Sequence, residues 1–150
     1  MVCSDVHGGD WMAKKIILVS HDGLAKGVLG AVNMICGKTP DMISLGLSPD
    51  GSVTELSQQV RNIVIRNSPH QVIIVADLLG GSVCNQCLQD LCDLSNVKII
   101  TGMSLPLVLA ILSYDGEFSD ADIDKVVKEA TDATKRVEII ACKDTDEEFF

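Results

Sequence analysis

Aromatic side chains are scarce in this sequence: Trp, Tyr and Phe together make up 3% of its 150 residues. Basic residues are also few, because 12 Lys and Arg stand against 21 Asp and Glu, giving a formal net charge of -9. Few rings are available to stack on single-stranded bases, and the negative charge repels phosphate backbones and anionic membrane surfaces. Without a local basic patch, we expect binding to neither nucleic acid nor membrane lipid.

Long hydrophobic runs are also missing. The longest, around Leu105 to Leu112, contains Pro106 and is too short to span a bilayer. Residues 1–12 contain acids and glycines where a secretory leader needs a basic start and an apolar run, so we expect a disordered extension there, with Met12 as a candidate natural start. Six cysteines in a chain without a leader indicate reduced thiols and a cytoplasmic protein.

What the sequence does have is enough apolar surface for one core, at 47% hydrophobic residues. We expect a single domain over residues 13–143, followed by an acidic tail at 144–150. Short apolar runs indicate strands at 16–19, 42–47, 72–76, 97–101 and 137–142. Apolar residues at helical spacing predict helices over 24–35, 52–67, 83–94, a stretch that begins after Ser104, and 119–134.

This alternation predicts a three-layer α/β fold: an open, mostly parallel sheet covered by helices on both faces, with an antiparallel last strand. In such sheets ligands bind beyond the carboxyl ends of the strands, where the strand order reverses. His21 follows the first strand, Asp77 and the loop Gly80-Gly81-Ser82 follow the third, and Gly102-Met103-Ser104 follows the fourth. We expect these loops to converge on one crevice.

The residue types in these loops suit phosphoryl transfer. A neutral imidazole such as that of His21 can act as a nucleophile near neutral pH. A carboxylate such as Asp77 can fix the ring tautomer and stabilise the positive charge that develops on the ring. Gly80 and Gly81 allow backbone N–H groups close to an anion, and Ser82 adds a hydroxyl at the start of a helix. We therefore predict His21 and Asp77 as catalytic residues and Ser82, Gly80 and Gly81 as phosphate-binding residues.

Each of these residues also has a plainer explanation. A lone histidine at a strand end is more often structural, an aspartate after a strand often caps a turn, and Gly-Gly is often only a tight turn. The functional interpretation rests on finding all of them at successive strand ends. The other histidines, His7 and His70, are given no role.

Three segments of the sequence resemble the IIA components of the mannose, fructose and sorbose class of bacterial phosphotransferase systems. V-S-H-D-G-L-A-K-G (19–27) is similar to the active-site segment of that family. A-D-L-L-G-G-S followed by Asn85 (76–85) and T-G-M-S-L-P-L-V-L (101–109) are similar to its second and third motifs. The resemblance extends from about Lys15 to Leu112.

The resemblance implies that His21 accepts a phosphoryl group from the histidine-containing phosphocarrier protein and passes it to a IIB component. That component then serves sugar uptake through membrane IIC and IID subunits. It also implies that Asp77 holds the ring, that Ser82 helps to bind the phosphoryl group, and that neither a cofactor nor a metal ion is needed. Members are commonly homodimers that exchange a C-terminal strand, which would here be residues 137–142.

The sequence departs from the family pattern at two places. Asp22 stands where glycine usually follows the histidine, and its carboxylate should repel an incoming dianion unless it points to solvent or caps the helix. Val83-Cys84 replaces Pro-Phe, which changes packing more than chemistry. Cys84 and Cys87 have the spacing of a redox pair, but with Cys92 they still lack a fourth zinc ligand, and we interpret them as core residues.

Other functions remain open at this point. A related carrier could serve a phosphotransferase-dependent dihydroxyacetone kinase or a regulator, again through His21. A receiver-like signalling module would instead take phosphate on Asp77 and need a divalent metal, but paired acids are missing after the first strand. A nucleotide-binding module is disfavoured because no G-x-G-x-x-G follows any strand.

Overall fold

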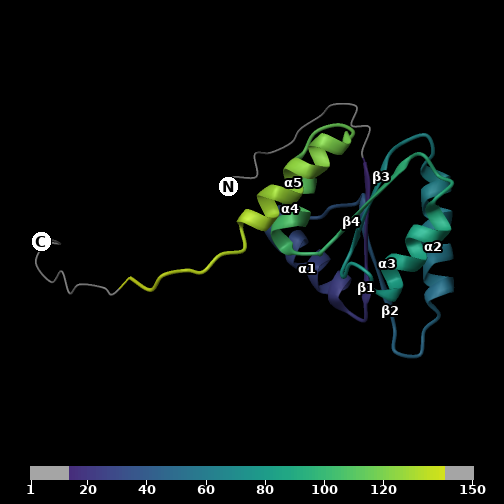
Figure 1. Ribbon diagram of the computed structural model, residues 1–150, viewed down its shortest axis with the longest axis horizontal. Helices are drawn as coiled ribbons and strands as arrows, with labels where there is room; N and C mark the ends of the chain where they lie inside the picture. The colour runs from purple at the N-terminus through teal and green to yellow at the C-terminus, as the bar shows by residue number, and fades with distance from the viewer. Residues whose placement is uncertain (1–13, 141–150) are drawn as a thin grey trace, which may run out of the picture.

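The computed structural model describes residues 14–140. Within them, strands and helices alternate along most of the chain (Figure 1). The elements are β1 (Lys15–His21), α1 (Leu24–Cys36), β2 (Met42–Leu47), α2 (Val53–Asn67), β3 (Val72–Ala76), α3 (Ser82–Leu91), β4 (Val97–Thr101), α4 (Leu105–Ser113) and α5 (Asp120–Asp132).

The four described strands form one parallel sheet in the order β2-β1-β3-β4. The chain moves from β1 outward to β2 and then returns to the other side of β1 with β3, so the strand order reverses between β1 and β3. The register places Val19 beside Ala76 and His21 beside Leu47. The residues that follow β1 and β3 therefore meet at the same edge of the sheet, at the reversal point.

Helices cover both faces of the sheet, as Figure 1 shows, with α1, α4 and α5 on one side and α2 and α3 on the other. Because successive side chains of a strand point to opposite faces, Ile16 and Leu18 pack under the first group while Ile17 and Val19 pack under the second. β3 is wholly buried, which explains why its sequence is an unbroken apolar run. The predicted three-layer fold with a parallel sheet is confirmed.

Several predicted boundaries shift by a few residues. α3 begins at Ser82 rather than at residue 83 and ends at Leu91 rather than at residue 94. α5 begins after Ser119, whose side chain accepts a hydrogen bond from the backbone N–H of Asp122 while the Asp122 carboxylate accepts one from the backbone N–H of Ser119. This reciprocal pair satisfies two backbone donors that a helix start otherwise leaves unpaired.

The predicted antiparallel last strand is wrong for the single chain. Residues 134–140 form no helix or strand, and they run away from the domain beyond α5 (Figure 1). Val137, Ile139 and Ile140 are 83%, 98% and 87% exposed. A strand needs a neighbour to pair with its backbone, and residues 137–140 have none among residues 14–140. The remainder of the prediction, residues 141–142, lies outside the described residues.

The proposed extension at residues 1–12 and the acidic tail at 144–150 also lie outside the described residues. No helix within residues 14–140 is both long enough and apolar enough to cross a bilayer.

Candidate phosphoryl-transfer site

The backbone brings His21 and Asp77 together at the reversal point of the sheet. His21 is the last residue of β1, and the backbone N–H of Asp77 donates to the carbonyl oxygen of Val19, which extends the pairing of β1 with β3 by one residue. In return, the backbone N–H of His21 donates to Oδ2 of Asp77 at 2.8 Å. These backbone contacts therefore position both residues independently of the contact between their side chains.

The imidazole of His21 is held at both nitrogens. Nδ1 lies 2.8 Å from Oδ2 of Asp77, and Nε2 lies 3.1 Å from the hydroxyl oxygen of Ser82. A carboxylate accepts hydrogen bonds only, so the proton belongs on Nδ1 and Nε2 keeps its lone pair, which then accepts from the Ser82 hydroxyl. This arrangement leaves the lone pair of Nε2 able to act as a nucleophile.

Burial differs between the two partners in a way that suits different roles. The side chain of His21 is 45% exposed, whereas that of Asp77 is 9% exposed. Burial by itself raises the pKa of Asp77, but hydrogen bonds from the backbone N–H and the ring of His21 outweigh it and lower the pKa below its ordinary value. Asp77 is thus an anion that supports the ring and is poorly placed to accept a phosphoryl group itself.

The glycine loop before α3 allows the ring to come close. A Cβ atom on Gly81 would lie 3.2 Å from Cε1 of His21, tighter than an ordinary contact. Gly80 has a φ of 77°, a left-handed conformation that glycine adopts without strain. The side-chain amide of Asn85 donates to the Gly80 carbonyl and anchors the loop.

The start of α3 faces the same site through Ser82, its first residue. Gly81 precedes the helix and has no side chain to accept from the N–H groups of the first turn. Those N–H groups lack helical partners and carry partial positive charge, which favours an anion at this position. The site thus joins a nucleophilic nitrogen to a set of anion-binding donors.

The third predicted loop does not join these contacts. Ser104 accepts from the backbone N–H of Leu107 and caps α4, and the N–H of Met103 donates to the carbonyl of Ala76. Within residues 14–140 neither residue hydrogen-bonds to the ring of His21. Of the three loops expected in one crevice, those after β1 and β3 make the site.

Sequence reasoning missed two residues that shape the turn after His21. The buried hydroxyl of Ser20 accepts from the backbone N–H of Ala25 at 2.8 Å and so steadies the start of α1. Position 46 on β2 requires glycine, because the chain after β1 passes close to it and a Cβ there would lie 2.1 Å from the carbonyl oxygen of Asp22. Ser20 could have been found from the sequence, because a serine stands there between a buried apolar run and a helix. Nothing in the sequence indicates the close approach at Gly46.

The paired cysteines lie in the core. Cys84 and Cys87 are buried against the α2 side of the sheet and form no disulfide with each other. Burial, together with nearby negative groups, raises the pKa of Cys87 to about 11. Reactive thiols instead have a lowered pKa and some exposure, so the interpretation of this pair as core residues agrees with the structure.

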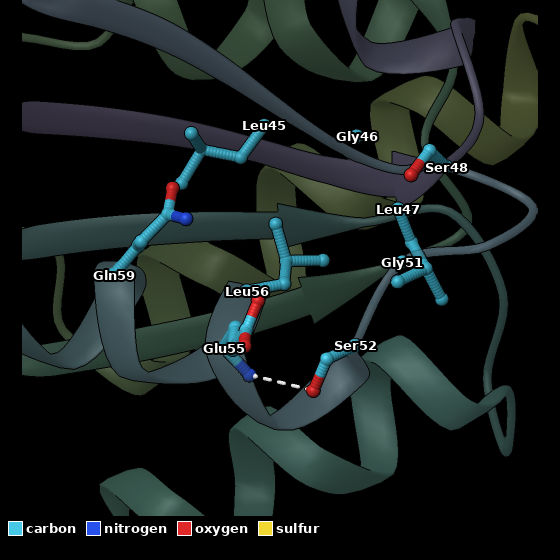
Figure 2. A pocket seen from close by; sticks show the side chains of 9 residues that line it. All are labelled: Leu45, Gly46, Leu47, Ser48, Gly51, Ser52, Glu55, Leu56 and Gln59. Atoms are coloured by element: carbon cyan, nitrogen blue, oxygen red, sulfur yellow. Dashed lines mark hydrogen bonds between the residues drawn. The ribbon is translucent and has the colours of Figure 1, made fainter.

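A small pocket of about 180 Å³ lies beside the site, between the end of β2 and the start of α2 (Figure 2). Leu47, Ser52 and Glu55 are among its lining residues, and the hydroxyl of Ser52 accepts from the backbone N–H of Glu55. None of His21, Asp77 and Ser82 lines this pocket. It is therefore separate from the predicted phosphoryl site, although Leu47 in its lining pairs with His21 in the sheet.

Comparison with known proteins points to one family. The family model of the fructose IIA component of the phosphotransferase system matches residues 15–143. A sorbose-specific EIIA component from Lacticaseibacillus casei is 26% identical over 97 residues, which cover 65% of this chain and 70% of that protein.

Solved structures agree in fold. The IIA protein associated with the fucose utilization operon of Streptococcus pneumoniae is 30% identical, with a TM-score of 0.72 over 82% of this chain and 92% of that chain. The mannose/sorbose specific IIA subunit from Enterococcus faecalis, at 18% identity, supports the fold alone, with a TM-score of 0.78 over 87% of this chain and 98% of that chain.

Proposed function

Because this chain belongs to the family of fructose-type IIA components of the phosphotransferase system, the phosphoryl carriers of sugar uptake, we propose that it carries the phosphoryl group on Nε2 of His21. The observation that supports this most strongly is the ring held at both nitrogens, by Asp77 at 2.8 Å and by Ser82 at 3.1 Å. We further propose that the protein acts in the cytoplasm.

The proposed step is a direct transfer between two proteins. Nε2 attacks the phosphorus of the donor's phosphohistidine, a new N–P bond forms, and the old N–P bond breaks with its electron pair returning to the donor ring. The His21 ring keeps its proton on Nδ1 and becomes cationic. Asp77 stabilises that charge, because a buried carboxylate in direct contact with the ring interacts more strongly with the cation than with the neutral ring.

Ser82 and the start of α3 have a second task in this proposal. Once phosphorus occupies the lone pair of Nε2, the Ser82 hydroxyl is released from the ring and can donate to a phosphoryl oxygen. The unpaired N–H groups of the first turn can do the same. These donors stabilise the negative charge on the transferring group without any metal ion.

The partners follow from the family rather than from contacts in the chain. We propose the histidine-containing phosphocarrier protein as the donor and a IIB component as the acceptor, with the membrane IIC and IID subunits acting downstream. His21 is nearly half exposed at the edge of the sheet, so another protein can reach it.

We also propose that the chain forms a homodimer through residues 137–142. Val137, Ile139 and Ile140 lie exposed beyond α5, and a solvated apolar segment of this kind is unfavourable unless a partner covers it. β4 is an edge strand of the described sheet, and an edge offers unpaired backbone groups to a strand from a second copy.

Mass analysis tests the carrier function directly. The protein is incubated with phosphoenolpyruvate, enzyme I and the histidine phosphocarrier, and its intact and peptide masses are measured without exposure to acid. We expect one acid-labile phosphoryl group on His21, absent in His21→Ala and retained in His70→Ala, an exposed histidine outside the site. Absence of label on the wild type, or a metal-dependent label on Asp77, would contradict the proposal.

A further inference from the structure

Asp22 has an unusual backbone conformation directly beside the proposed phosphoryl site. Its φ is 46°, and within residues 14–140 it is the only residue other than glycine with a positive φ. Its backbone N–H donates to the carbonyl of Leu47 at 2.7 Å, and its carbonyl oxygen packs over Gly46. These contacts use only the backbone, and glycine adopts this conformation with less strain than aspartate.

The carboxylate of Asp22 has no structural role in the described chain. The side chain is exposed and makes no hydrogen bond or ion pair with residues 14–140. It does not cap α1 either, because the N-cap is Gly23 and the side chain that bonds to the first turn is the Ser20 hydroxyl, which accepts from the backbone N–H of Ala25. The fold therefore does not explain why an acid occupies this left-handed position.

Its place in the sequence fixes its neighbourhood. Consecutive Cα atoms are about 3.8 Å apart, so the Asp22 carboxylate lies on the order of 10 Å from a phosphoryl group on the His21 ring. A phosphoryl group carries about -1.5 to -2 charges near neutral pH. The cationic ring offsets part of that charge, so phosphorylation adds about one net negative charge beside Asp22. Because the site is exposed and the distance is about one Debye length at 0.1 M salt, the repulsion is modest and depends on salt.

We propose that Asp22 sets the phosphoryl-transfer potential of this carrier, an inference that rests on the proposed function. Its charge raises the free energy of the phosphorylated protein relative to the unphosphorylated one. In the outgoing step the N–P bond at Nε2 breaks, its electron pair returns to the ring, and phosphorus bonds to the acceptor's nucleophile. That step relieves the repulsion, so Asp22 makes His21 a stronger donor and a weaker acceptor.

Two substitutions separate charge from backbone strain. Asp22→Asn removes the charge, keeps nearly the same shape and tolerates the left-handed conformation. Asp22→Gly removes both the charge and the strain. Asp41→Asn is the matched control, because this exposed acid precedes β2 at the opposite end of the sheet and its loss changes the net charge equally.

The quantity to measure is the equilibrium constant for phosphoryl exchange with the histidine phosphocarrier, from the phosphorylated fractions of both proteins. At about 10 mM ionic strength we expect Asp22→Asn and Asp22→Gly to shift it about threefold toward the phosphorylated chain, and less than about twofold at 0.5 M. Asp41→Asn should leave it unchanged.

The outcomes against the inference are distinct. If His21 is labelled in every variant but Asp22→Asn leaves the equilibrium constant unchanged, the charge has no such role. If only Asp22→Gly shifts it, backbone strain is the cause. If His21 is not labelled even in the wild type, the proposed function fails first and this inference falls with it.

Discussion

We expect the charge of Asp77 to matter more than its size, because a carboxylate at Nδ1 favours the tautomer of His21 with its proton on that nitrogen. In Asp77→Asn the amide can donate to Nδ1, which favours the wrong tautomer and removes the anion that stabilises the cationic ring. We expect the rate of phosphorylation by the phosphorylated phosphocarrier to fall by about 10²- to 10⁴-fold, measured by rapid quench. Asp41→Asn serves as the control, and a loss smaller than about threefold would contradict this role.

The lowered pKa of Asp77 also predicts how stability depends on pH. A carboxyl group whose pKa is lower in the folded protein than the ordinary 3.8 stabilises the fold above that value, and loses this contribution as the pH falls through its folded pKa. From pH 5 downward, the difference in unfolding free energy between wild type and Asp77→Asn should therefore narrow. Urea denaturation at several pH values measures it, and a difference that widens below pH 4 would refute the assignment.

At the scale of elements, the close approach of β2 to the turn after β1 predicts contrasting effects for two glycines. Gly46→Ala places a Cβ 2.1 Å from the carbonyl oxygen of Asp22, so backbone must move, and we expect a loss of about 2–3 kcal/mol of stability. Gly27→Ala, on an exposed helix position with nothing within 4 Å of the new Cβ, should gain about 0.5–1 kcal/mol.

Urea denaturation compares both variants with the wild type. Because the displaced turn carries His21, Gly46→Ala should also slow phosphorylation, while Gly27→Ala serves as the control for a change of glycine as such. If the two variants are equally stable, the turn after β1 shifts at little cost in free energy and the prediction for Gly46→Ala is wrong.

The strands and helices near the site were predictable because the apolar patterns of neighbouring residues there all indicate the same elements. Apolar runs located the described strands, and the parallel arrangement made it certain that His21 and Asp77 would end at one edge. The left-handed Asp22 was not predictable, since aspartate only tolerates that conformation and the constraint comes from Leu47 and Gly46 on another strand. Segment 137–142 has a strand-like sequence, but its described part, residues 137–140, forms no strand, because local patterning cannot supply the neighbour with which a strand pairs.

At the scale of the whole molecule, the exposed segment after α5 predicts the oligomeric state. We expect light scattering to give twice the 16.1 kDa of one chain. Replacing Val137, Ile139 and Ile140 together by serine should convert the protein to a monomer without unfolding it, because these side chains are 83–98% exposed in the single chain. Leu88→Ser, on the exposed side of α3, is the control. A wild type that is monomeric at all concentrations would exclude the dimer.

The His21 ring has one nitrogen turned inward to Asp77 and one open edge next to Ser82. If His21 carries the phosphoryl group as proposed, a donor and an acceptor protein must take turns at that edge, because two macromolecules cannot occupy it together. We then expect turnover without a ternary complex, seen as parallel lines in double-reciprocal plots. An excess of either unphosphorylated partner would slow phosphoryl transfer, because it would occupy the edge of the ring that the other partner needs. The relative abundance of the two proteins would then control the rate of transfer.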